Sequence, residues 1–156
     1  MAIRELPEEI LGRFANPEPG REAALVACSP SVGIIGLAQY VADETGADCE
    51  VAVVVDDAWQ QQGLGYALFD RLLCVATHAG ITHAFADVLA ENHAMRRLAS
   101  KFGCRIRTNP IAPFLVQVTK TLADKDYGRE PEFAPCLGTP NPKRVSPVMR
   151  AARRQS

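Results

Sequence analysis

Hydrophobic positions in the first half of the chain fall into short runs that suit β-strands. The apolar run of residues 23–28 and the run of residues 32–41 are separated by a Ser-Pro-Ser turn, which predicts a β-hairpin. Residues 50–55, with the sequence EVAVVV, are almost wholly apolar and mostly β-branched, as in a strand that is covered on both faces. We therefore expect this third strand to lie centrally in a sheet.

Helical spacing takes over after residue 63. Leu64, Leu68 and Leu72 recur on one face of a predicted long helix, and Gly80 ends it. A second helix opens at Glu91-Asn92 and stops at Gly103. The remaining apolar runs predict strands over residues 83–89, 104–107 and 114–119.

This order of elements predicts an α/β domain with one mixed, mostly antiparallel sheet that is flanked by helices. The domain is expected to cover residues 1–122, and residues 6–14 are predicted to form a short helix before its first strand. Residues 123–156 are rich in proline, glycine and charge and have little hydrophobic pattern. They are predicted to form a flexible tail.

Composition and charge narrow the classes of partner. The chain has 156 residues, of which 47% are hydrophobic and 22% charged, and its formal net charge is -1. This balance gives no electrostatic reason to expect nucleic acid or a membrane surface as partner. No run approaches the roughly 18 apolar residues of a membrane span, and the N-terminus lacks a signal-peptide core. A cytoplasmic location is expected.

The five cysteines stand at irregular spacing with no C-x-x-C pair, which favours reduced thiols over a disulfide framework. Cys74 and His78 have the spacing of metal ligands on a helix, but no second pair completes a zinc site. No metal is expected.

The strongest candidate for a binding site is the junction between the apolar strand and the long helix, VVVDDAWQQQGLG. Gly63 and Gly65 let the backbone approach a ligand closely, and the free N–H groups of a helix N-terminus suit a pyrophosphate. The third glycine of a dinucleotide fingerprint and a Walker lysine are both missing. The alternative is that the two glycines only close a tight turn.

The segment Gln60-x-x-Gly63-x-Gly65 resembles the acetyl-CoA signature Q/R-x-x-G-x-G/A of the GNAT superfamily of N-acetyltransferases. The later segment from Asn92 to Leu98, which leads into Phe102-Gly103, resembles the second signature of the same family. The similarity covers about residues 20–120 and is greatest to the acetyltransferase domain of bacterial protein-lysine acetyltransferases.

The resemblance implies a GNAT-like acyl-CoA N-acyltransferase fold that transfers an acetyl group from acetyl-CoA to a primary amine, such as a protein lysine. Backbone N–H groups would bind the pyrophosphate, and the valine-rich strand would splay from its neighbour to pair with the pantetheine arm. Asn92 would contact the cofactor or position its helix. The implied cofactor-binding residues are Val53, Val54, Val55, Gln60, Gln61, Gln62, Gly63, Leu64, Gly65 and Asn92.

Direct transfer needs a base for the amine. Glu50, which opens the central strand where related enzymes often place a glutamate, is the first candidate. Asp87, inside the next apolar strand, is the second, because an acid in such a place needs partners or a function.

The chain departs from the family pattern at three places. Ala99 stands where many members have a tyrosine acid, and Gln61 and Gln62 replace a small residue and a cation of the phosphate loop. The segment before residue 23 is short, so the first strand is expected to be missing, which leaves a sheet edge open for a homodimer. These departures keep open a second reading, an acyl-CoA-binding sensor or regulatory module without catalysis.

Overall fold

A computed structural model describes residues 18 and 20–127. One six-stranded sheet in the order β1-β2-β3-β4-β6-β5 organises this part of the chain. All neighbouring strands are antiparallel except β3 and β4, which are parallel. The predicted mixed, mostly antiparallel sheet with flanking helices is therefore confirmed. The elements are β1 (Glu22–Ser29), β2 (Gly33–Ala42), β3 (Asp48–Val55), η1 (Asp57–Trp59), α2 (Leu64–His78), β4 (His83–Leu89), α3 (His93–Lys101), β5 (Arg105–Thr108), β6 (Leu115–Thr121) and α4 (Asp124–Tyr127).

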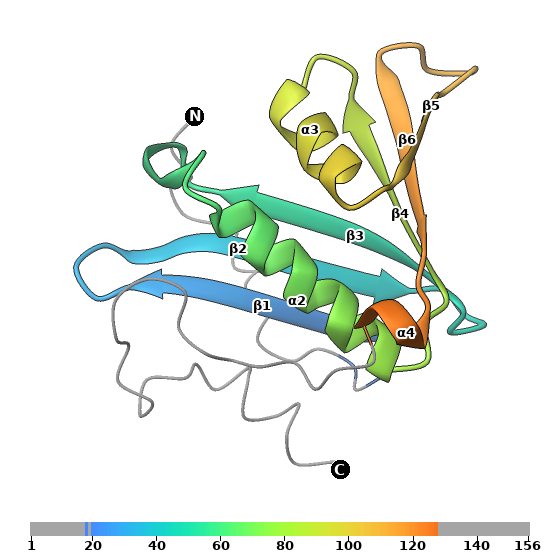
Figure 1. The fold of residues 1–156 in the computed structure, drawn as a ribbon, viewed down its shortest axis with the longest axis horizontal. Coiled ribbons are helices and arrows are strands. Elements are labelled where there is room, and N and C mark those ends of the chain that lie inside the picture. The colour runs from blue at the N-terminus through green and yellow to red at the C-terminus, as the bar shows by residue number, and fades with distance from the viewer. Residues whose placement is uncertain (1–17, 19, 128–156) are drawn as a thin grey trace.

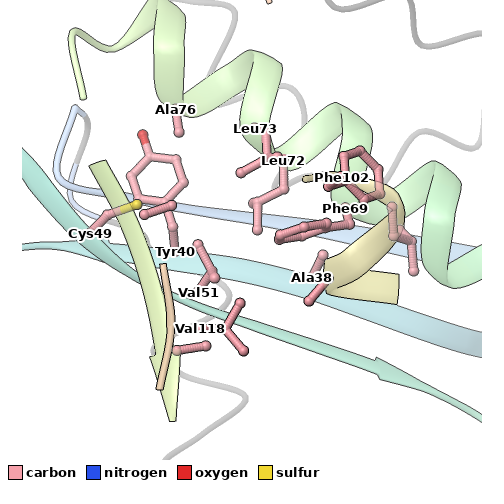
Figure 2. Packing of buried hydrophobic residues seen from close by; sticks show 14 of the residues in the cluster. Ala38, Tyr40, Cys49, Val51, Phe69, Leu72, Leu73, Ala76, Phe102 and Val118 are labelled. Atoms are coloured by element: carbon pink, nitrogen blue, oxygen red, sulfur yellow. The ribbon is translucent and has the colours of Figure 1, made fainter. Parts of the chain in front are cut away.

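The hydrophobic core lies between one face of the sheet and the two helices α2 and α3 (Figure 1). Leu72 and Leu73 of α2 are fully buried and point toward Tyr40 and Val51 on the strands below (Figure 2). Phe102, at the end of α3, packs edge-on against Phe69 of α2 with ring centroids 4.8 Å apart. The apolar stripe predicted along the long helix is thus buried in the core, and Phe69 beside it contacts the end of α3.

β3 is central as predicted, but the expectation that both of its faces are covered is wrong. Cys49 and Val51 are buried beneath α2, whereas Glu50, Ala52 and Val54 are exposed on the other face. The side chains of a strand alternate between the faces of its sheet, and both long helices of the described chain lie on the same face. The opposite face is called here the open face.

The short helix predicted over residues 6–14 lies outside the described residues. So does the predicted tail from residue 128 onward. The short helix α4 follows the sheet, and its Tyr127 is only 6% exposed within the core. The division at residue 122 stays a prediction. β1 pairs only with β2 and so forms one edge of the described sheet, but the homodimer that an open edge suggests also stays a prediction.

The four cysteines within residues 20–127 form no disulfide, in agreement with the reduced thiols predicted. None of the helices in this part of the chain has both the length and the apolar character that a membrane crossing requires.

Candidate active site

The sheet divides between β3 and β4. These strands pair over only three positions, Asp48↔His83, Cys49↔Ala84 and Glu50↔Phe85. Beyond Glu50 they diverge, with β3 continuing along α2 while β4 leaves with β6 (Figure 1). The sheet therefore opens into a fork whose apex lies at Glu50 and Phe85.

The open side of β3 presents backbone hydrogen-bonding groups to this fork. The N–H of Asp56 donates to the carbonyl of Ile35, 2.9 Å away, across the β2–β3 ladder. Bonded pairs alternate along an antiparallel ladder, so Val54 also faces β2, whereas Val53 and Val55 face the fork. The splayed strand expected from the sequence is present. The backbone of Val53 and the N–H of Val55 are the groups that it leaves available.

The loop after β3 is held by its own side chains. The amide of Gln60 donates to the carbonyl of Val55 at 3.1 Å and to the Asp57 carboxylate at 2.9 Å. The carboxylate of Asp56 accepts from the N–H of Ala58 at 3.0 Å, and Gln62 donates to the carbonyl of Ala58 at 3.2 Å. Gln60 and Gln62 therefore hold the loop in one conformation through their side chains. The backbone of residues 61–65 that follows is fixed in position by these bonds.

The loop ends in a row of free backbone donors. Gln61 and Gly63 have φ of 60° and 84°, and the left-handed turn that they make leads into α2 at Leu64. Within residues 20–127, no acceptor forms a hydrogen bond with the N–H groups of residues 61–65. Such donors at the positive end of a helix bind anions, and a diphosphate fits them. Residues 60–65 contain no lysine or arginine, so the attraction that this segment itself offers to an anion comes from its backbone.

Gly63→Ala is expected to reduce the free energy of unfolding by about 1–2 kcal/mol, because a Cβ disfavours the left-handed backbone at this residue. The space itself is open, since a Cβ there would meet no atom within 4 Å. Urea unfolding would measure the change. Gly65→Ala is the matched control, because Gly65 does not have a positive φ and its Cβ would make ordinary contacts of 3.7 and 3.8 Å. Equal stability of the two variants would contradict the strain argument.

Both predicted acids lie on the open face at the fork. Glu50 does not open its strand, which begins at Asp48. It stands instead at the last position where β3 and β4 pair. Asp87 is on β4, two residues beyond Phe85, and is exposed. The argument that Asp87 must find partners inside an apolar strand is therefore wrong, because strand alternation turns its side chain out of the core. The role of each acid stays a prediction.

Asn92 positions α3. Its side-chain oxygen accepts a hydrogen bond from the N–H of Met95 at 3.0 Å and so caps the helix. Of the two roles that the sequence left open for Asn92, the structure shows the positioning role, and contact with a cofactor stays a prediction. Ala99 of the same helix is buried at 1% exposure, and its methyl side chain has no proton to give, so this position supplies no acid.

Three cysteine thiols of the described chain are poorly suited to act as nucleophiles. Burial, with a smaller contribution from nearby Asp48, raises the pKa of Cys49 to about 12. Burial likewise raises the pKa of Cys28 and of Cys104. The reactive form of cysteine is the thiolate, so these shifts disfavour nucleophilic chemistry at these three thiols.

Sequence reasoning missed a pocket of about 590 Å³ on the open face beside the fork. Its lining includes Asp48 of β3, His83 and Phe85 of β4, Thr119 of β6 and Arg105 of β5. The signal was present as period-two alternation in each strand, but only the register between strands brings these residues together.

Residues 3–105 match the family model of the acetyltransferase (GNAT) domain, and the chain therefore belongs to the GNAT acetyltransferase family. No match was found among curated proteins.

Solved structures of acetyltransferases have a fold similar to that of this chain. The GNAT domain of PAT from S. lividans has 24% sequence identity and a TM-score of 0.67, over 76% of this chain and 70% of its own. The ribosomal-protein-S18-alanine N-acetyltransferase from Escherichia coli has 18% identity and a TM-score of 0.58, over 78% and 80%. YncA from Salmonella typhimurium, a structure with its cofactor acetyl-CoA, has 23% identity and a TM-score of 0.54, over 64% of each chain.

Proposed function

We propose that this protein binds acetyl-CoA across the fork and transfers the acetyl group to a primary amine, with Glu50 as the base. The observation that carries the proposal is the alignment of free donors at residues 61–65 with the open backbone edge at Val53 and Val55. A diphosphate at the first and an amide-bearing pantetheine arm along the second would direct the thioester toward the apex. Membership of the GNAT family supports the same cosubstrate.

The proposed chemistry is direct attack. The amine approaches the thioester carbonyl from the open face while the Glu50 carboxylate, directly or through one water, accepts a proton from it. The new C–N bond forms, the C–S bond breaks, and the departing thiolate takes a proton from solvent. A protein lysine is one acceptor of this kind, as the sequence resemblance suggests. The cytoplasmic location remains part of the same proposal.

The test combines calorimetric titration with acetyl-CoA and release of free thiol across a panel of amines. We expect saturable binding and thiol release that depends on an amine. Binding without thiol release for any acceptor would instead support the regulatory module, for which the buried Ala99 in place of a tyrosine acid is the favouring observation. Lack of saturable binding at millimolar acetyl-CoA would overturn both.

A further inference from the structure

The pocket on the open face is lined by a carboxylate on its β3 side, Asp48, and by a guanidinium on the outer strand, Arg105, while Glu50 lies next to the lining on the same face. Strand register aligns Glu50, Phe85, Thr119 and Arg105 in one row across β3, β4, β6 and β5. The next row contains Asp87, Gln117 and Arg107. Carboxylates therefore stand at the fork and guanidinium groups at the outer strand, with neutral side chains between them.

Within the part of the chain that the structure describes, Glu50 and the two arginines carry charges without an opposite partner. Among the described residues, none forms an ion pair with Glu50, Arg105 or Arg107. The carboxylate of Asp48 contacts only the ring of His83 in this way, with 3.2 Å between Oδ1 and Nδ1. Neighbouring strands lie about 4.8 Å apart, so the backbones of Glu50 and Arg105 are separated by roughly 14 Å. Their side chains are long enough to shorten that gap considerably.

We infer that this pocket holds the acceptor and that the acceptor is a small molecule with a primary amine at one end and an anionic group at the other. This inference rests on the proposed function, because it places the amine at Glu50 beside the thioester. The anion then lies against Arg105, whose planar guanidinium suits a carboxylate. A volume of about 590 Å³ is in the range of small-molecule sites, and the half-buried Phe85 offers an apolar surface to the carbon chain between the charges.

Two probes that differ only in the anion test the inference: Nα-acetyl-lysine, with a free carboxylate, and Nα-acetyl-lysinamide, without one. For each, the acetyl-transfer rate and the amide NMR shifts of the protein are measured. We expect kcat/KM to be about tenfold higher for the carboxylate, since a hydrogen bond to a charged group contributes roughly that factor or more. Arg105→Ala should remove this preference by slowing only the carboxylate probe. Arg97→Ala is the matched control, because Arg97 is an exposed arginine on α3, and this variant should keep the preference for the carboxylate probe.

The NMR titration separates this inference from the function on which it rests. Shifts at Phe85, Thr119 and Arg105 that are stronger for the carboxylate probe, without any thiol release, would support the pocket and refute the acetyl transfer. Equal rates and equal affinities for the two probes, or a preference that survives Arg105→Ala, would overturn the inference even in an active enzyme. Faster transfer to lysine peptides that lack an anionic group would do the same.

Discussion

Glu50→Gln is expected to lower turnover by about a hundredfold or more, the usual contribution of a positioned general base, while the affinity for acetyl-CoA stays unchanged. The variant keeps the size of the side chain and removes its ability to accept a proton. Because Glu50 is exposed at the apex of the fork, no core packing depends on its charge, so the fold should be preserved. Thiol release at saturating acetyl-CoA and calorimetry would measure the two quantities separately.

Asp87→Asn is the comparison variant. Its carboxylate lies on the same open face but on β4, beyond the last position where β3 and β4 pair. We expect it to keep a turnover close to that of the original protein. A loss at Asp87 with near-normal turnover of Glu50→Gln would transfer the role of base to Asp87. Normal turnover in both variants would remove Glu50 and Asp87 from the proposed step.

Gly65→Pro is expected to weaken acetyl-CoA binding by about tenfold to a hundredfold, the range for one hydrogen bond to a charged group. Proline removes the N–H of Gly65, and no acceptor within residues 20–127 uses that group. Since the first turn of a helix makes no internal bond through this position, the substitution deletes a donor without breaking the ladder of α2. Calorimetric titration would give the dissociation constant.

Gly65→Ala again serves as control, because it retains the N–H and its methyl group fits beside Val55 and Leu98. Circular dichroism would establish that both variants keep their helix content. A dissociation constant for Gly65→Pro equal to that of Gly65→Ala would show that the diphosphate does not bind at these amides, and the proposed path of the cosubstrate would be wrong.

Local patterns predicted the elements well. The leucine spacing and the following glycine located α2, and the residues of β4 were predicted as the structure has them, because each signal acts within one turn or one strand. The alternation along β3 could not be predicted from its sequence, since the exposed Ala52 and Val54 are as apolar as the buried Val51. Only the presence of both long helices on one face separates the two sets.

The candidate site was predicted in part. Glycine and strand context pointed to the loop at residues 61–65, but that Gln60 and Gln62 support it through their side chains follows from hydrogen bonds seen only in three dimensions. The pocket was missed entirely. Arg105 lies 55 positions after Glu50 in the numbering, and no local pattern reveals that four strands align them in one row.

The groups that β3 turns toward the fork are peptide N–H and C=O, and every residue except proline carries the same pair. Exchange of one β-branched residue for another at Val53 or Val55 would therefore leave this edge chemically intact. A fork built from backbone groups therefore tolerates amino-acid substitutions along its own strand. Chains that share only about a fifth of their residues can therefore keep the same hydrogen-bonding edge.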